Sequence, residues 1–199
     1  MPRPKQRTPE LRDQVLTAAL ELLVRDGVAT FTARNIARTA GTSTPAVYEL
    51  FGDKSGLVRA VFFEGFRLLH RYLDTPADTG DPLADLIGLV AAYRGFMCEN
   101  PVLAQVMFSR PFSDFDPTEA EQEAGAAVRR IVVDRVRRCV DAGRLRGDCV
   151  DIAHAVVALT QGLALAEAAR RLGSTETSVD RRWDLAVRAL VAGFGPPAA

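Results

Sequence analysis

Apolar residues recur near the amino end of the chain with the spacing of an α-helix. One stripe comprises Leu11, Val15, Ala18 and Leu22, at intervals of four, three and four residues. Thr8 can cap the start of this helix. Gly27 can end it, because glycine adopts left-handed backbone conformations at little steric cost. The pattern therefore predicts a first helix between these two residues.

Two shorter helical patterns follow, separated by a turn. Thr32 can cap the first pattern, whose inward positions are Ile36, Ala37 and Ala40. Gly41 breaks it, and Ser43 or Thr44 can cap the second pattern, with Pro45 at its start. The inward positions of the second pattern are Val47, Leu50 and Phe51. Two short helices joined by a glycine turn are typical of the helix-turn-helix arrangement.

Neither short helix is long enough to be stable alone, so both must pack on the first helix. We expect a trihelical core that contains Phe31, Ile36, Val47, Leu50 and Phe51 together with Leu11, Val15 and Leu22. Further helices are expected over residues 54–73, 81–99, 100–108, 118–143, 150–172 and 179–194. Because no alternating strand pattern of useful length occurs, the sequence predicts an all-α protein.

The turn-rich segment TPADTGDP marks a joint between the two ends of the chain. We expect an N-terminal helix-turn-helix domain over residues 1–53, a connecting helix over 54–74 and a C-terminal helical domain over 75–199. The chain has a formal net charge of zero, but residues 1–60 carry nine Lys and Arg against six Asp and Glu. This basic N-terminal part favours a polyanionic partner.

The outward side of the second short helix carries small and hydroxyl-bearing residues. Small side chains at its start allow close approach to base edges in a DNA major groove, and the Tyr48 hydroxyl can reach a phosphate. Lys54 opens the next helix, where positive charge and N–H groups attract phosphate. Arg34 has the planar guanidinium that binds guanine through two hydrogen bonds. The candidate DNA-binding residues are Thr32, Arg34, Ser43, Thr44, Pro45, Ala46, Tyr48 and Lys54.

The segment FTARNIARTAGTSTPAVYELFGDKSGLVRAVF resembles the DNA-binding region of the TetR family of transcriptional repressors. The matching positions are Thr32, Ile36, Ala37, Ala40, Gly41, Val47, Tyr48, Phe51, Lys54 and Leu57. The resemblance covers residues 8–73. It implies a ligand-responsive repressor that binds operator DNA. One departure is that the aromatic pair often found in the family's recognition helix is reduced here to Tyr48, which Glu49 follows.

Three C-terminal stretches, YRGFMCENPVLAQVMFSRPF, ALTQGLALAEAARRLG and RRWDLAVRALVAGFG, resemble the C-terminal domains of one branch of that family. The resemblance implies a pocket for a small-molecule effector and a homodimer built from the last two helices. The residues themselves agree with a dimer, since these helices are rich in small side chains that allow close packing. Ordinary packing within one chain is the alternative.

Aromatic and methionine side chains are frequent in the middle of the chain, and such side chains adapt to varied apolar ligands. The candidate ligand-binding residues are Tyr93, Phe96, Met97, Met107, Phe108 and Phe112. The alternative for each of them is a place in an ordinary core. A small apolar or amphipathic effector is the expected ligand.

An enzyme is a competing hypothesis, but no Ser/His/Asp or Cys/His arrangement, phosphate-binding loop or HExxH motif occurs. We expect no catalytic residues, no cofactor and no metal site, and we expect His154 to be a core histidine. A structural or protein-interaction bundle without DNA binding is another alternative, which Arg34, Tyr48 and Lys54 argue against. Three cysteines without a CxxC pair, and no signal peptide or membrane span, predict a cytoplasmic protein.

Overall fold

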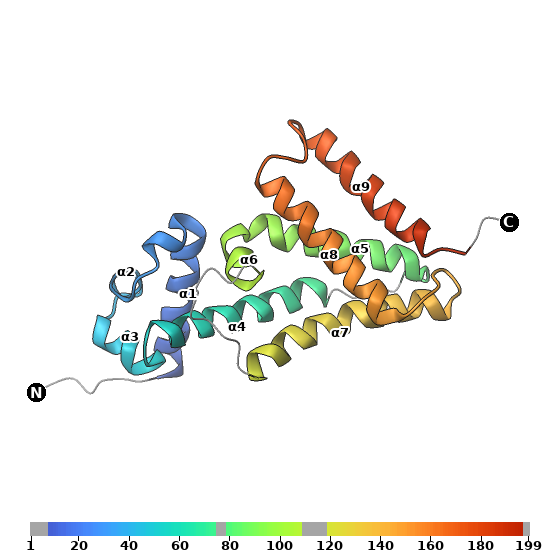
Figure 1. The fold of residues 1–199 in the computed structure, drawn as a ribbon. Helices are drawn as coiled ribbons and strands as arrows, with labels where there is room; N and C mark the ends of the chain where they lie inside the picture. Colours follow the sequence, from blue (N-terminus) through green and yellow to red (C-terminus); the bar gives the residue numbers. More distant parts are fainter. Residues whose placement is uncertain (1–7, 75–78, 109–118, 197–199) are drawn as a thin grey trace, which may run out of the picture. The chain divides into compact units, whose positions relative to one another are not determined.

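The computed structural model describes residues 8–74, 79–108 and 119–196 of the chain. Within these ranges the regular structure is entirely helical, which confirms the all-α prediction (Figure 1). The elements are α1 (Pro9–Asp26), the 3-10 helix η1 (Val28–Thr30), α2 (Ala33–Thr39), α3 (Thr44–Phe51), α4 (Lys54–Leu73), α5 (Pro82–Glu99), α6 (Pro101–Phe108), α7 (Glu119–Asp141), α8 (Cys149–Ala168) and α9 (Glu176–Gly193).

The described residues divide into two compact units. The first is drawn from residues 1–68 and 100–124, and the second from residues 69–99 and 125–199. The first unit therefore contains α6 as well as the three N-terminal helices. Helix α6 packs against α1. The domain bounds expected from sequence place Pro101–Phe108, which form α6, in the C-terminal domain.

Local side-chain chemistry explains where the N-terminal helices begin and end. The Thr8 hydroxyl accepts the N–H of Leu11 at 3.3 Å, and Pro9 occupies the first turn of α1. At the other end Gly27 adopts a φ of +76°, and its N–H donates to the carbonyl oxygen of Leu23 at 3.0 Å. The first predicted helix is thus confirmed with both of its predicted ends.

Helices α1, α2 and α3 enclose a small apolar core in the first unit (Figure 1). Its buried side chains include Val15, Leu22, Phe31, Ile36, Val47 and Phe51, as predicted. Leu11 and Leu50, which were expected in this core, are only half-buried. Full burial of one such apolar side chain stabilises a fold by roughly 1.5–3 kcal/mol, which is how two very short helices are held in place.

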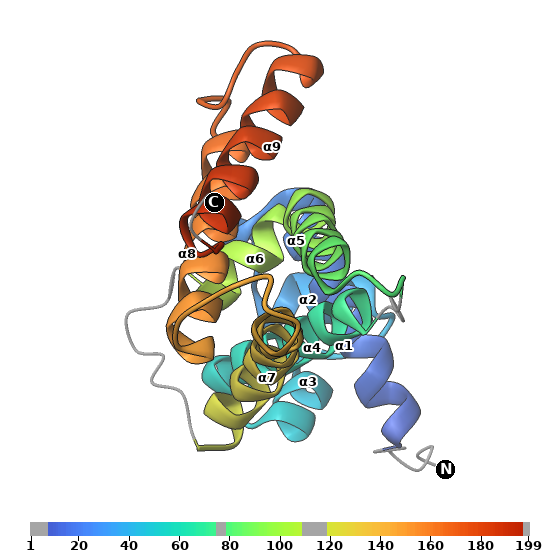
Figure 2. The same cartoon turned by 90° about the vertical axis from the view of Figure 1, so that its right-hand side faces the viewer.

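Helices α5, α8 and α9 pack on one another in the second unit, and α8 and α9 lie side by side (Figure 2). Two boundaries differ from the sequence prediction. Helix α8 ends at Ala168 rather than near residue 172, because Arg170 adopts a left-handed backbone conformation with a φ of +55°. Helix α9 begins at Glu176 rather than at residue 179, because Thr175 and Ser178 form a reciprocal capping box.

A buried carboxylate joins α5 to α7 in the second unit. Asp85 is 1% exposed and its Oδ1 accepts the Thr79 hydroxyl at 2.8 Å. Its Oδ2 lies 3.5 Å from the Arg138 guanidinium and 3.8 Å from that of Arg135. The hydrogen bond from Thr79 is the main reason that the pKa of Asp85 lies below its usual value. Oδ1 is hydrogen-bonded, whereas the buried Oδ2 has no hydrogen-bond partner and is compensated by the two guanidinium charges.

One of the described helices, α8, is long and apolar enough to cross a membrane by length and composition. Core helices of soluble proteins also meet this criterion. Only 28% of its apolar window is buried within the chain.

Candidate nucleic-acid interface

Four residues, Ala40 to Ser43, connect α2 to α3. Gly41 has a φ of +63°, and a Cβ added there would meet nothing within 4 Å, so the backbone conformation rather than space favours glycine. The N–H of Thr42 donates to the carbonyl oxygen of Ala37 at 2.8 Å, which closes the end of α2. The predicted helix-turn-helix is therefore present, with its two short helices in contact.

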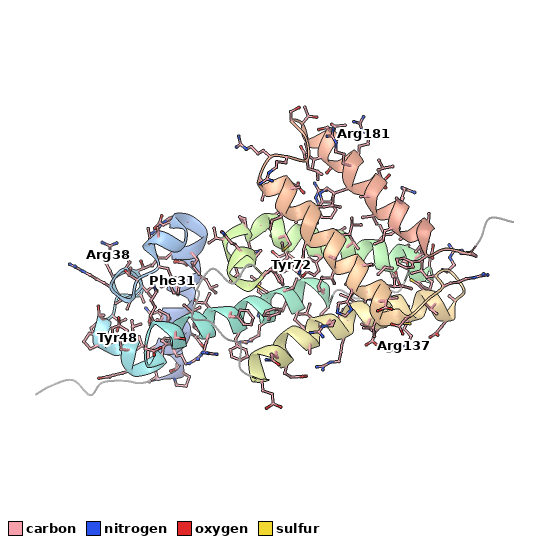
Figure 3. The ribbon with its side chains drawn as sticks, in the orientation of Figure 1. Phe31, Arg38, Tyr48, Tyr72, Arg137 and Arg181 are labelled. Carbon is pink, nitrogen blue, oxygen red and sulfur yellow. The ribbon has the colours of Figure 1, made fainter. Side chains whose placement is uncertain are left out.

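Ser43 rather than Thr44 caps α3, since its Oγ accepts the N–H of Ala46 at 3.3 Å. The solvent side of the helix carries Pro45, Tyr48 and Glu49, which are exposed, while Thr44 and Ala46 are half-buried. The Tyr48 side chain is 44% exposed and points away from the helices of its unit (Figure 3). An exposed ring of this size on a short helix is available to a partner.

On α2, the two sequence-predicted residues Thr32 and Arg34 are both exposed. The Thr32 Oγ1 caps the helix by accepting the N–H of Asn35 at 3.2 Å. This bond uses a lone pair of the oxygen and leaves the hydroxyl hydrogen to serve as a donor. Thr32 can therefore cap the helix and donate to a phosphate at the same time.

Lys54 is the first residue of α4 and is exposed. Asp53 is absent from the residues predicted to bind DNA, and its Oδ1 accepts the N–H of Gly56 at 2.8 Å and so caps α4. An Asp immediately before the first residue of a helix is a recognisable cap signal. The carboxylate adds negative charge at a helix start that was expected to attract phosphate, so Lys54 also offsets a neighbouring charge.

The junction between α3 and α4 is tight. A Cβ on Gly56 would lie 1.8 Å from the carbonyl oxygen of Phe51, a backbone atom that cannot turn aside. The Phe51 ring is also covered by Arg12, whose Cζ is 5.0 Å from the ring centroid. The absence of a side chain at Gly56 thus allows the start of α4 to approach the end of α3, and Arg12 joins α1 to the same end of α3.

The sequence-predicted effector residues are distributed over both units. Tyr93, Phe96 and Met97 are buried on α5 in the second unit. Met107 is buried and Phe108 half-buried on α6 in the first unit. Phe112 lies outside the described residues. All the described members except the half-buried Phe108 are buried within their own unit.

Polar contacts accompany the α5 residues. Gln161 of α8 donates its Nε2 to the Tyr93 hydroxyl oxygen at 3.0 Å. Burial raises the pKa of Tyr93 to about 12, with the Gln161 hydrogen bond acting in the opposite direction. The ring of Phe96 packs edge-on against that of Tyr72, with centroids 5.6 Å apart. These contacts place one buried phenol within an otherwise apolar layer.

On α6, Met107 packs closely against α4 within the first unit. A Cβ on Gly65 would lie 2.6 Å from the Met107 Sδ, so the glycine permits this approach. Phe108 contacts Phe66 of α4 edge-on, with centroids 5.9 Å apart. The two side chains thus stabilise the packing of α6 on α4.

A shallow apolar groove lies between α5, α8 and α9 in the second unit. Its lining residues are Leu86, Ile87, Val90, Val156, Leu159, Thr160, Val187, Leu190 and Val191, none of which was predicted to bind ligand. The single hydroxyl in this lining, that of Thr160, donates to the Val156 carbonyl oxygen at 2.7 Å. The groove therefore presents almost wholly apolar surface.

Among the described residues, no group of three or more His, Cys, Asp or Glu side chains is placed to hold a metal ion. The expectation that His154 is a core residue is wrong. It is exposed on α8, and its Nδ1 lies 2.8 Å from the Val150 carbonyl oxygen one turn earlier. The mostly apolar sequence of α8 suggested burial, but the helix buries only one side.

Two short capped helices around a glycine turn, with a hydroxyl-rich and basic outer side, define a helix-turn-helix regulatory protein. A family model for bacterial regulatory proteins of the tetR family matches residues 15–61. A second model, for the tetracyclin repressor-like C-terminal domain, matches residues 86–190. The chain therefore belongs to the tetR family of bacterial regulatory proteins.

Individual relatives agree with this assignment. The chain is 27% identical over 170 residues to Tetracycline repressor protein class C of Escherichia coli, an alignment that covers 85% of this chain and 72% of the relative. A protein of unknown function from Rhodococcus sp. RHA1 has a similar structure, with a TM-score of 0.80, 28% identity and coverage of 98% of this chain and 100% of that one. A TetR protein from Acinetobacter baumannii AYE, solved in complex with minocycline, has a TM-score of 0.63, 23% identity and coverage of 90% and 93%.

Proposed function

We propose that this regulator represses transcription by binding duplex operator DNA through α2, the turn and α3. The proposal rests on the exposed surface of the helix-turn-helix. Arg34 on α2, Tyr48 on α3 and Lys54 at the start of α4 are all exposed there, and the first turn of α3 contributes small residues. In this arrangement the second helix enters the major groove, and the first crosses the DNA backbone. Duplex DNA is thus the partner whose shape and charge suit this surface.

Each candidate residue has a defined task in this proposal. Thr44, Pro45 and Ala46 form the first turn of α3 and are small enough to let the helix approach base edges. Tyr48 donates its hydroxyl to a phosphate. Thr32 and Ser43 cap their helices and can donate their hydroxyl hydrogens to phosphate, while Arg34 binds guanine and Lys54 binds phosphate.

The functional unit is a homodimer joined through α8 and α9. Helix α8 is apolar but only 28% of its apolar window is buried within the chain. The large apolar side chains Leu165 on α8 and Leu185 on α9 are 59% and 68% exposed. Large exposed apolar side chains on two neighbouring helices indicate an interaction site. A second copy would cover this surface. The resulting dimer would place its two helix-turn-helix units on half-sites about 34–36 Å apart.

The effector is a small apolar or amphipathic molecule, and the aromatic and methionine residues predicted from the sequence are its candidate contacts. Support comes from the TetR relative that was solved with minocycline. Such a molecule can release DNA only by its differential affinity for two states of the dimer, which is typically worth about 1–3 kcal/mol. Family membership also supports a cytoplasmic, non-enzymatic role.

Selection of bound fragments from random duplex DNA tests the DNA-binding part. Wild-type protein is expected to enrich a palindromic site and to lose affinity steeply as the salt concentration rises. Lys54→Ala is expected to weaken binding to all duplexes by the same factor, whereas Arg34→Ala should weaken binding and also relax the sequence preference. If wild-type protein enriches no sequence and does not bind duplexes even at low salt, the chain is a structural or protein-interaction bundle without DNA binding.

A thermal-shift screen of small apolar compounds tests the effector part. A true effector is expected to raise the melting temperature in proportion to the logarithm of its concentration and to release bound operator DNA. A compound that stabilises the protein without changing its affinity for DNA would be a ligand but no effector.

A further inference from the structure

A short hydrogen-bonded chain connects η1 to the outer side of α2. The Asn35 Nδ2 donates to the carbonyl oxygen of Thr30 at 2.9 Å. The Asn35 Oδ1 in turn accepts from the Arg38 Nη2 at 3.3 Å. Because the carbonyl of Thr30 can only accept, the amide of Asn35 must turn its oxygen toward Arg38. The backbone of η1 thus determines which atom Asn35 offers to the guanidinium.

Arg38 is exposed near the end of α2 and was absent from the residues predicted to bind DNA. It lies one helical turn after Arg34, so the two arginines share a face of α2. Figure 3 shows Arg38 and Tyr48 reaching outward on the same side of the first unit. The first helix of a helix-turn-helix crosses the DNA backbone, which is where an arginine on this face would meet phosphate.

Asp26 lies within electrostatic range of Arg38 but is already paired with Arg25. The pKa of Asp26 is lowered first by its hydrogen bonds with Arg25, and among the smaller causes is the positive charge of Arg38. Both carboxylate oxygens of Asp26 already accept from Arg25, at 3.0 and 2.8 Å. A guanidinium carries five N–H donors, and the bond to Asn35 uses one of them.

We propose that Arg38 contacts a DNA backbone phosphate and that Asn35 is the positioning residue that aims its guanidinium. The proposal rests on the DNA-binding function proposed above. A phosphate contact adds affinity without sequence preference, whereas a base contact would add both. Arg38 would therefore set how tightly the protein holds any duplex, while the first turn of α3 sets which duplex it prefers.

The salt dependence of binding tests the contact. Each phosphate neutralised by a protein cation contributes about 0.9 to the slope of log K against log salt. Arg38→Ala is therefore expected to lower the magnitude of the slope by about 0.9 per subunit, or about 1.8 for a dimer. It should also weaken binding to selected and random duplexes by the same factor. Arg129→Ala removes the same charge from an exposed position on α7 and is expected to leave the slope unchanged.

A double-mutant cycle tests the positioning role. Asn35→Ala should weaken binding several-fold in the wild-type background, but by less than about twofold when Arg38 is already alanine. A loss that is equally large in both backgrounds would mean that Asn35 acts through the fold or through its own DNA contact, and would overturn the positioning role. Thermal melts of all four proteins identify any loss of folding.

Comparison of wild type with Arg38→Ala distinguishes a failure of the phosphate contact from a failure of the DNA-binding function. If wild-type protein binds duplex DNA with a steep salt slope and Arg38→Ala keeps that slope, the phosphate contact is wrong and the DNA-binding function stands. A changed sequence preference in Arg38→Ala would instead assign the residue to a base. If wild-type protein binds no duplex at all, the proposed function itself fails.

Discussion

Arg94 of α5 holds Glu167 of α8 through two parallel hydrogen bonds, from Nε at 2.9 Å and from Nη2 at 2.8 Å. The same guanidinium forms an ion pair with Asp180 of α9 at 2.8 Å and covers the ring of Trp183, its Cζ lying 5.0 Å from the ring centroid. Trp183 donates its Nε1–H to the Glu167 carboxylate at 2.7 Å. One arginine thus joins the three helices that line the apolar groove.

Glu167→Gln removes the charge from this network while keeping its shape. Because hydrogen bonds to charged groups contribute about 1.5–3 kcal/mol and partial exposure reduces that value, we expect a loss of about 1–2 kcal/mol in the free energy of unfolding. Trp183 is the single tryptophan of the chain, so its fluorescence follows the transition directly. The control is Asp184→Asn, which breaks an exposed pair with Arg188 and should change stability by less than about 0.5 kcal/mol.

The ionisation of Glu167 should make the stability of the protein depend on pH. The hydrogen bond from Arg94 is the first cause that lowers the pKa of Glu167 below its ordinary value of 4.5, and burial opposes it. A lowered carboxyl pKa contributes stability that is fully present above the unfolded-state pKa and disappears as pH falls through the folded-state pKa. The stability difference between wild type and Glu167→Gln should therefore be constant above about pH 5.5 and shrink below pH 4.5. Urea titrations at a series of pH values measure it, and a difference that grows on acidification would contradict the assignment.

The proposed dimer depends on the apolar side chains that α8 and α9 expose. Leu165→Glu and Leu185→Glu should each shift the protein from dimer to monomer, because a charge is costly to bury without a partner. Sedimentation velocity measures the change. Ala91→Glu adds the same charge at an exposed position on α5 and should leave the dimer intact. Dimers that persist in both leucine variants would place the interface elsewhere.

Two glycines near α3 should respond differently to substitution. Gly41→Ala is expected to cost about 1–2 kcal/mol, because only its left-handed backbone opposes a side chain, and Gly41→Asn should cost less. Gly56→Ala should cost more, since its Cβ would collide with the Phe51 carbonyl oxygen at 1.8 Å. Thermal denaturation ranks the three variants. Equal losses for Gly41→Ala and Gly56→Ala would mean that the α3–α4 junction relaxes freely.

The N-terminal helices could be predicted from sequence because their ends are defined by local chemistry. Thr8, Thr32 and Ser43 each accept an N–H three residues ahead, and such caps can be recognised without knowing the fold. The start of α9 was missed because its capping box uses Ser178 at a position where Glu or Gln is the usual signal.

Features that depend on residues distant in the sequence could not be predicted. Arg94 and Glu167 are 73 positions apart, and no local pattern links them. The groove between α5, α8 and α9 is likewise formed by three separate segments. Arg38 was missed for another reason, since its bond to Asn35 matters only once the amide orientation set by Thr30 is known. The sequence-predicted DNA-binding and effector residues remain predictions that the experiments above address.

The sparse burial of α8 has a consequence for the cell. If a second copy covers this helix, only dimers occupy operators. At chain concentrations below the dissociation constant of the dimer, the dimer concentration rises with the square of the chain concentration. Repression would then set in over a narrow range of protein abundance, and halving the gene dose would lower operator occupancy by more than half.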